Sequence, residues 1–357
     1  MPGRLFCLYA ELSESAPPQS NMEESIMEKQ KLSPATVLPW YDDRVETVWK
    51  DDTAPVVEAM EEASQYTPRK IYDYLERKVW KQDEAKRAAS VMMYQCLRSI
   101  KSNAMFIGPS GCGKTHIWHC LKEFFPDRIE IVDSSSLTLD GWKGSTKWKD
   151  LLRSPIFRSG NHSVLVLDEV DKMLAPKFSY GENVSYSIQS EGLTMLEGAR
   201  VAVKDDSVIY EIDTAKISFV LCGAFSNKAH DVAEKNGGRI GFGAVREAVQ
   251  PYAKPLGEAD LIEFGVMPEF LGRIQRIVNL QPMTADDYYR MTDNSLGLLA
   301  HIREQYQADI RLTPQKRWEL AELASRTGLG VRGMENQIRQ LIDNALFDDC
   351  ERHHFAF

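Results

Sequence analysis

The sequence has 357 residues, which is enough for two domains with well-buried cores. Its composition, 43% hydrophobic and 27% charged, is typical of a soluble protein, and no apolar run reaches the length of a membrane span. The net charge of −9 and the lack of a basic block argue against nucleic acid as the main partner. The six cysteines include no closely spaced pair, so we expect free thiols, no zinc site and a cytoplasmic location.

Residues 1–66 are expected to form an acidic, partly disordered extension. They hold thirteen Asp/Glu and five Lys/Arg, a net charge of −8. A solvated tail and a docking arm for substrates or adaptors remain equally open interpretations. At Thr67 the pattern changes, because Thr67 can cap a helix with Pro68 at its first position, and helical spacing then continues to Leu97.

Val79 and Trp80 lie between the two helices expected in this stretch. Such residues can flank an adenine base. Simple core packing explains them equally well, so the residues alone do not decide between the two.

A short apolar run, 104–107, precedes a glycine-rich loop and a helix. Residues 108–115 read Gly-Pro-Ser-Gly-Cys-Gly-Lys-Thr and fit the phosphate-loop pattern in the strand–loop–helix context that it requires. The glycines let backbone N–H groups approach phosphate, and the positive end of the helix faces the same anion. Lys114 is expected to bind the β- and γ-phosphates of ATP, and the Thr115 hydroxyl to hold Mg²⁺. The predicted nucleotide contacts are Gly108, Pro109, Ser110, Gly111, Cys112, Gly113, Lys114, Thr115 and His116.

Cys112 has two interpretations within this loop. A redox switch is conceivable, but a small residue at a variable position is the better explanation.

Residues 164–169 form a fully apolar strand that ends in two carboxylates, as expected for a central parallel strand. Ligands bind at the carboxyl ends of such strands. Asp168 is therefore expected to hold Mg²⁺, and Glu169 to orient and deprotonate the attacking water.

Two glycine-rich stretches are candidates for contacts with other proteins. Gly141, Trp142, Lys143 and Gly144 describe either a mobile loop that presents an aromatic side chain or a surface turn. Residues 228–259 are expected to be loop-like. In their middle, Ile240, Gly241 and Phe242 either anchor a partner or fold back into the core.

The end of the chain has mainly helical patterns. Apolar strands are expected at 217–221 and 277–280, with a short strand at 309–312. Thr284 and Asp287 resemble a capping box at the start of the helical region. We therefore expect a large domain over 67–281 and a small, mainly helical domain over 282–357.

Taken together and in this order, the motifs resemble the ClpX branch of the AAA+ protein unfoldases. The matching segments are 108–115, Leu-Asp-Glu-Val-Asp-Lys at 167–172, Gly-Ala-Phe at 223–225, Ile-Gly-Phe-Gly-Ala at 240–244, the run 260–273 and Gly-Val-Arg-Gly at 330–333. The resemblance extends from about Thr67 to about Phe347. It implies an α/β fold, in which an AAA+ P-loop NTPase domain with a parallel central sheet flanked by helices precedes a small, mainly helical lid domain.

The resemblance also implies roles for single residues. Arg273 resembles the arginine finger that reaches the γ-phosphate held by the neighbouring subunit. Arg332 resembles the sensor arginine of the small domain, and Val79 and Trp80 match the adenine-flanking pair. Without the resemblance, both arginines would be read as surface residues.

Two loops match the parts of the family that contact other proteins. Residues 141–144 stand where the family has its pore loop, which grips the substrate polypeptide. Ile240, Gly241 and Phe242 match the tripeptide that docks into the ClpP peptidase. A homo-hexameric ring with ATP sites between its subunits is the implied assembly.

The sequence departs from the family pattern in several places. The amino-terminal zinc-binding domain of the family is absent, and Trp142 and Lys143 replace Tyr and Val in the pore loop. The loop at the pore mouth is shortened to about 201–210, Cys222 replaces a polar sensor residue, and Glu335 replaces an arginine. The changes in the pore loop are expected to alter substrate grip, and Cys222 is expected to alter γ-phosphate sensing.

The expected function is that of an ATPase, requiring ATP and Mg²⁺, that unfolds polypeptide substrates and feeds them to a ClpP-like peptidase. A stand-alone ATPase that remodels protein complexes without proteolysis is the main alternative. A nucleic-acid motor and a nucleotide-switch scaffold agree less well with the acidic charge and with the presence of Glu169 and Arg273. We expect no nucleic acid, no membrane and no zinc among the partners.

Overall fold

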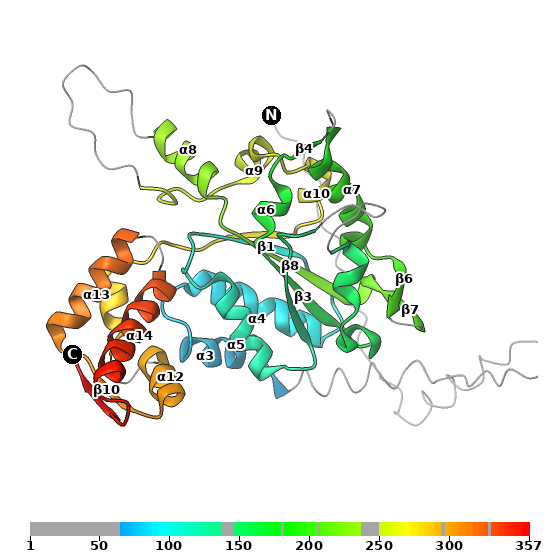
Figure 1. The fold of residues 1–357 in the computed structure, drawn as a ribbon. Helices are drawn as coiled ribbons and strands as arrows, with labels where there is room; N and C mark the ends of the chain where they lie inside the picture. Colours follow the sequence, from blue (N-terminus) through cyan, green and yellow to red (C-terminus); the bar gives the residue numbers. More distant parts are fainter. Residues whose placement is uncertain are drawn as a thin grey trace, which may run out of the picture. The chain divides into compact units, whose positions relative to one another are not determined.

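The structure, a computed structural model, describes residues 65–137, 146–179, 182–205, 208–236, 250–293, 297–327 and 330–357. Its centre is a five-stranded sheet with the order β2-β3-β8-β1-β9, in which all neighbouring strands are parallel (Figure 1). The strands are β1 (Ala104–Ile107), β2 (Ile129–Asp133), β3 (Ser163–Asp168), β8 (Ile217–Gly223) and β9 (Arg276–Asn279). The expected α/β fold with a parallel central sheet is confirmed.

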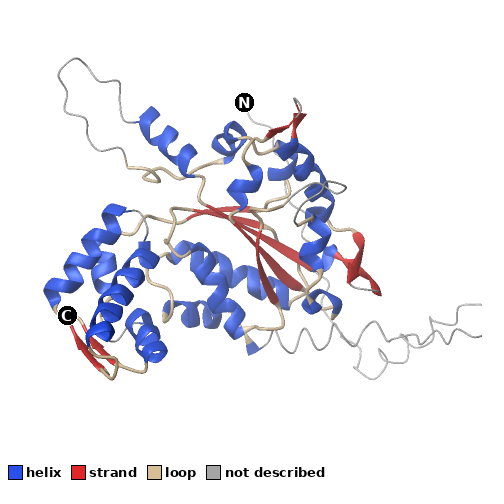
Figure 2. Ribbon diagram, viewed as in Figure 1, coloured by secondary structure: helices blue, strands red, loops and turns tan. Residues whose placement is uncertain are grey.

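Helices cover both faces of this sheet (Figure 2). One face is covered by α3 (Pro68–Glu76), α4 (Asp83–Leu97) and α5 (Lys114–Phe124). The other face is covered by α6 (Val170–Leu174), α7 (Val184–Glu197), α8 (Ser226–Asn236), α9 (Glu258–Phe264) and α10 (Pro268–Leu271).

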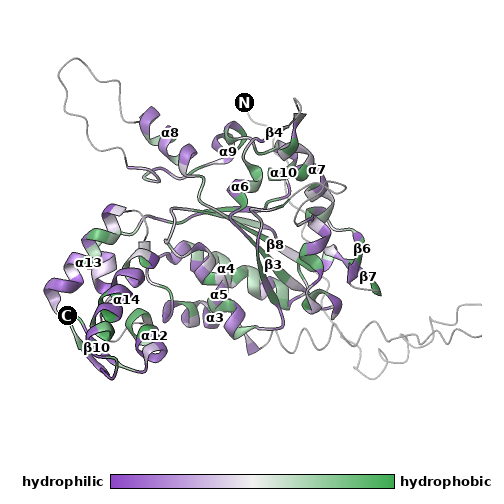
Figure 3. Ribbon diagram, in the orientation of Figure 1, coloured by the Kyte–Doolittle hydropathy of each residue, from purple (hydrophilic) through white to green (hydrophobic). Residues whose placement is uncertain are grey.

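Alternate side chains of each strand enter the two cores. Phe106 and Val166 pack with α3, α4 and α5, whereas Met105 and Leu165 belong to the opposite core. Because both faces are covered, β1 and β8 are buried along their whole length and consist mainly of apolar residues (Figure 3). This burial explains why the sequence shows continuous apolar runs instead of alternation.

Two segments differ from the sequence-based expectation. Residues 201–205 and 208–210 belong to a pair of antiparallel strands, β6 (Arg200–Asp205) and β7 (Val208–Asp213), and not to a loop. The stretch expected to be loop-like from residue 228 begins as α8, which buries Ala229 and Val232 against the core. The smaller elements are β4 (Phe178–Ser179), β5 (Glu182–Asn183) and the 3-10 turns Trp148–Leu152, Pro155–Arg158 and Thr214–Lys216.

The C-terminal residues have a core of their own, which includes Leu299, Ile310 and Ile338. Its elements are α11 (Ala285–Met291), α12 (Gly297–Tyr306), α13 (Pro314–Thr327), α14 (Gly330–Asp348), β10 (Asp309–Arg311) and β11 (His354–Ala356). The capping box of Thr284 and Asp287 is present at the start of α11. In the described ranges, no helix is both long enough and apolar enough to cross a membrane.

Candidate nucleotide-binding site

The phosphate loop runs from Gly108 to Thr115 and connects β1 to α5. Gly111 and Gly113 have φ angles of 73° and 101°, a backbone region that favours glycine. Lys114 is the first residue of α5, so the unpaired N–H groups of the helix N-terminus face this loop. A Cβ placed on Gly113 would meet no heavy atom within 4 Å. Open backbone at the positive end of a helix fits a phosphate group.

The Lys114 ammonium group lies inside the loop. Its Nζ donates hydrogen bonds to the carbonyl oxygens of Gly108 and Pro109, at 2.7 and 2.9 Å. The loop therefore holds the charge beside its own backbone, where the β- and γ-phosphates are expected to bind.

Thr115 and Asp168, the two residues assigned to Mg²⁺, are in direct contact. Thr115 Oγ1 donates to Asp168 Oδ2 at 2.8 Å, and Asp168 Oδ1 accepts from the backbone N–H of Glu169 at 2.9 Å. The contact arises because only β8 separates β1 from β3 in the sheet, Asp168 is the last residue of β3, and Thr115 lies in α5 just after the loop that follows β1. A hydroxyl and a carboxylate suit Mg²⁺, which usually keeps several waters beside one or two protein ligands. Among the described residues, no group of three His, Cys, Asp or Glu is placed to hold a metal ion.

Glu169 follows Asp168 directly and has a φ of 56°, in the left-handed region. Its Oε2 accepts from Lys172 Nζ at 2.5 Å, and both side chains are largely exposed. The hydrogen bond from Lys172 to Glu169 raises the pKa of Lys172. The carboxylate is therefore bound to a lysine one turn along the chain, and it must leave this pair to act as a base.

Cys222 at the end of β8 is fully buried and belongs to the core shared with α3, α4 and α5. Burial raises the pKa of its thiol, and the negative charge of Asp168 raises it further. The thiol is thus neutral and acts as a core side chain beside the residues predicted to hold Mg²⁺. Cys112 is buried as well, and burial raises its pKa, which favours the packing interpretation over a redox switch.

Val79 and Trp80 lie in different environments, although they are adjacent. Val79 is 4% exposed and belongs to the same core as α3 and α4. Trp80 is half-buried, and its indole Nε1 donates to Asp287 Oδ1 at 3.3 Å. His116 is exposed in the first turn of α5, where its Nε2 lies 3.6 Å from Cys120 Sγ.

The start of α14 touches the phosphate loop. A Cβ built on Gly330 would lie 2.8 Å from Gly111 Cα, so the two backbones are in close contact. Arg332 is exposed in the first turn of this helix. The structure therefore brings the predicted sensor arginine into the neighbourhood of the phosphate loop of its own chain.

Arg273 lies at the opposite end of β1. Its carbonyl accepts from Asn103 Nδ2 at 3.0 Å, and Asn103 directly precedes β1, whereas Gly108 follows the strand. The five residue steps from Asn103 to Gly108 correspond to about 16 Å along the strand, which separates Arg273 from the phosphate loop. The guanidinium group is paired with Glu197, and its Nη1 donates to the Glu269 carbonyl at 2.6 Å.

The predicted pore loop (Gly141, Trp142, Lys143, Gly144) and the predicted docking tripeptide (Ile240, Gly241, Phe242) lie outside the described residues. The same holds for nearly all of the predicted extension 1–66.

Three residues that contact predicted site residues were not themselves singled out as site residues from the sequence: Gln82, Asp287 and Glu197. Gln82 Nε2 donates to the carbonyl of Cys112 in the phosphate loop at 3.2 Å. Asp287 contacts Trp80, and Glu197 pairs with Arg273. Local sequence gave no signal for these contacts, because each joins residues at least 30 positions apart.

Comparison with known proteins agrees with this geometry. The sequence model of the family described as AAA domain (Cdc48 subfamily) matches residues 99–277, or 179 of the 357 residues. The matched range includes the phosphate loop, Asp168, Glu169 and Arg273. The chain is also similar to the protein named ATP-dependent Clp protease ATP-binding subunit ClpX from Treponema denticola. The two are 26% identical over 326 residues, which cover 79% of this chain and 77% of the relative.

Proposed function

The chain belongs to the AAA domain family (Cdc48 subfamily), it is a homologue of ClpX and an ATPase, and from this premise we propose that it unfolds proteins. In this proposal it forms a hexameric ring, hydrolyses ATP at sites between subunits, and feeds the unfolded chains to a ClpP-like peptidase. The proposed parts are a large ATPase domain over 67–281 and a helical lid domain over 282–357.

The residues of the phosphate loop and of β3 divide the work of ATP hydrolysis. Lys114 and the N-terminus of α5 bind the phosphates, and Thr115 and Asp168 would hold Mg²⁺. Mg²⁺ held by these two side chains would supply positive charge to offset the negative charge that develops on the phosphates. The Glu169 carboxylate first separates from Lys172 and then takes a proton from the attacking water.

The position of Arg273 is the observation that carries the proposal. It lies at the end of β1 opposite the phosphate loop, so it is too far away to reach the γ-phosphate bound in its own chain. An arginine finger placed there has to act on the nucleotide of a neighbouring subunit, which makes hydrolysis depend on assembly. Arg332, in contrast, lies close to the loop of its own chain and suits a sensor that reports hydrolysis to the helical domain.

Two further segments have proposed roles in this motor. Gly141, Trp142, Lys143 and Gly144 would grip the substrate, because a bulky aromatic side chain can push on any polypeptide. Ile240, Gly241 and Phe242 would bind the peptidase. Movement of the lid domain after hydrolysis would shift the pore loops along the substrate.

Mixing two inactive variants tests the shared site directly. Arg273→Ala removes the finger but leaves the phosphate loop intact, and Glu169→Gln removes the base but keeps the finger. Each variant alone should hydrolyse ATP slowly. Mixed at equal concentration, they should recover part of the wild-type turnover, because some interfaces then combine an intact Glu169 with an intact Arg273. Two Glu169→Gln preparations mixed together are the control.

Additive turnover in the mixture, with no recovery, would contradict the shared site. The peptidase is tested separately, by deleting residues 240–242 and measuring degradation of a folded reporter in the presence of ClpP. Loss of degradation with unfolding retained supports docking through this loop. Unfolding by the intact protein that never leads to degradation would favour a stand-alone remodelling ATPase.

A further inference from the structure

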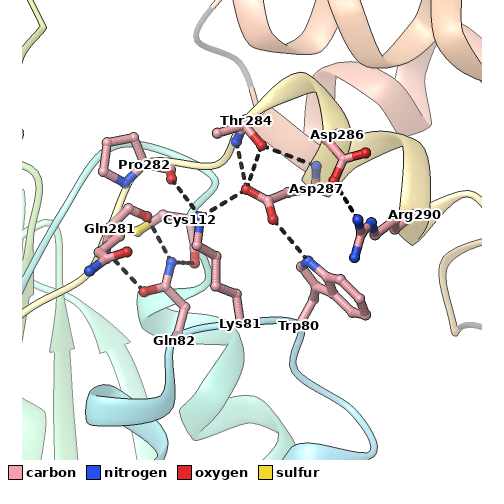
Figure 4. Close-up of polar contacts among 10 residues, drawn as sticks. All are labelled: Trp80, Lys81, Gln82, Cys112, Gln281, Pro282, Thr284, Asp286, Asp287 and Arg290. Carbon is pink, nitrogen blue, oxygen red and sulfur yellow. Dashed lines mark hydrogen bonds and ion pairs between the residues drawn. The ribbon is translucent and has the colours of Figure 1, made fainter.

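A cluster of polar contacts joins the segment between α3 and α4 to the start of α11 (Figure 4). Its centre is the carboxylate of Asp287. Oδ1 accepts from the indole Nε1 of Trp80 at 3.3 Å, and Oδ2 accepts from Lys81 Nζ at 2.9 Å. Oδ2 also accepts from the backbone N–H and the hydroxyl of Thr284, both at 2.8 Å.

The cap of α11 does not require all of these contacts. A capping box needs only the reciprocal bonds of Thr284 and Asp287, which are present. Trp80 and Lys81 are additional donors from more than two hundred residues away in the chain. The neighbouring carboxylate, Asp286, shows the contrast, because it forms an ion pair with Arg290 on the same helix and both side chains are more than half exposed.

The segment that carries Trp80 is held in an unfavourable backbone conformation. Lys81 and Gln82 have φ angles of 56° and 62°, in the left-handed region that residues with a Cβ rarely adopt. This bend turns Lys81 towards Asp287 and Gln82 towards the phosphate loop (Figure 4). The Gln82 amide then bonds Gln281 from both ends, through Nε2 to the carbonyl at 2.8 Å and through Oε1 to the N–H at 3.0 Å.

The carboxylate is well suited to hold its donors. Only 14% of the Asp287 side chain is exposed, and the Lys81 side chain is 32% exposed. Hydrogen bonds to a charged group in such partly buried surroundings are stronger than those between neutral groups. Fixing the indole N–H fixes the plane of the Trp80 ring as well, because the ring is rigid.

We infer that Asp287 is a positioning residue for nucleotide binding, which orients the half-buried Trp80 ring against the base of ATP. The inference rests on the proposed function as an ATPase motor and on the family resemblance, which implies that Trp80 flanks adenine. In this inference, recognition of the base depends on the carboxylate of Asp287 at the start of α11. That carboxylate accepts a hydrogen bond from Trp80 and forms an ion pair with the neighbouring Lys81. Gln82 is a separate tie, between the same segment and the backbone of the phosphate loop.

The test compares a ligand that has a base with one that lacks it. Dissociation constants for ATP and for inorganic tripolyphosphate are measured by calorimetry on wild type, Asp287→Asn and the matched control Asp286→Asn. Asp287→Asn keeps the shape of the side chain and loses the charge, so we expect ATP binding to weaken about tenfold. Tripolyphosphate binding should change less than twofold, and Asp286→Asn should resemble wild type for both ligands.

Two other variants separate positioning from helix capping. Lys81→Met leaves the capping box intact and should weaken ATP binding about threefold, because it removes the ion pair that holds the Trp80 segment to Asp287. Thr284→Ala removes a capping contact and leaves both Trp80 and Lys81 in place, so ATP binding should stay within twofold of wild type. The double variant Lys81→Met/Asp287→Asn should lose less ATP-binding free energy than the sum of the two single variants, because both substitutions remove the same contact.

Equal loss of ATP and tripolyphosphate binding in Asp287→Asn would overturn the inference, as would unchanged ATP binding. Weaker ATP binding in Thr284→Ala with unchanged ATP binding in Lys81→Met would also overturn the inference, since helix capping would then explain the weaker binding. Failure of the proposed function looks different, because wild type itself would bind neither ATP nor tripolyphosphate.

Discussion

Replacing Gly330 by alanine should weaken ATP binding, because this glycine links α14 to the phosphate loop. The new Cβ would lie 2.8 Å from Gly111 Cα and 3.2 Å from the carbonyl carbon and oxygen of Gly111. These neighbours are backbone atoms of the proposed phosphate loop, so no flexible side chain can move away to relieve the contact.

Two costs add up in this variant. Gly330 has a φ of 61°, and an alanine in the left-handed region costs about 1–2 kcal/mol in the free energy of folding. Forcing an extra methyl group into a packed region costs about 1–3 kcal/mol more, unless the loop moves. If the loop moves, this second cost appears in ATP binding instead, as an affinity about 5- to 150-fold weaker.

Gly160→Ala is the matched control. Gly160 has a φ of 75°, but a Cβ there would meet no heavy atom within 4 Å. The free energy of unfolding of the Gly160→Ala variant should therefore fall by about 1–2 kcal/mol, and the variant should bind ATP as wild type does. Calorimetry with ATP and urea unfolding on both variants separate the two costs. Equal ATP affinity in Gly330→Ala and Gly160→Ala would refute the reasoning that α14 presses on the phosphate loop.

Three further outcomes are expected. Glu169→Gln should bind ATP normally and hydrolyse it about 10²- to 10⁴-fold more slowly in a phosphate-release assay, and unchanged turnover would exclude Glu169 as the base. Glu197→Gln frees Arg273 from an exposed ion pair, so half-maximal ATPase activity should occur at a protein concentration about 1.5- to 5-fold lower. A higher concentration would mean that Glu197 supports the finger. Burial would raise the pKa of Asp287, but hydrogen bonds from Lys81, Thr284 and Trp80 outweigh it and lower the pKa to about 2. Asp287 should therefore stabilise the fold by about 2 kcal/mol above pH 4, and this stability should be lost as the pH falls from 4 towards 2. The free energy of unfolding in urea is measured for wild type and Asp287→Asn. A difference between the two that stayed constant from pH 5 to pH 2.5 would contradict this prediction.

Features that depend on neighbouring residues in the sequence were predictable. The strand, loop and helix around Lys114 follow from an apolar run, glycines at fixed spacing and helical periodicity, all within about twenty residues. The caps at Thr67 and Thr284 were predicted correctly for the same reason, since each bonds a residue three positions on. The β3 strand was recognised because burial on both faces makes its residues 164–167 apolar without interruption.

Features that depend on distant contacts were missed. The part of helix α8 from residue 228 onwards was expected to belong to a glycine-rich, loop-like stretch, and only the packed fold shows that Ala229 and Val232 are buried. Lys228 in the same helix is 3% exposed and pairs with Glu263, a partner that the sequence does not reveal. The contact of Asp287 with Trp80 spans 207 positions, so the sequence showed Asp287 only as a helix cap.

The most direct test of the proposed function is the unfolding of a stably folded, tagged fluorescent reporter by the purified protein with ATP. The account predicts loss of fluorescence that requires ATP hydrolysis, is absent in Glu169→Gln, and becomes degradation when a ClpP peptidase from the same cell is added. ATP hydrolysis at a normal rate with no unfolding of tagged or untagged reporters, with and without the peptidase, would contradict it.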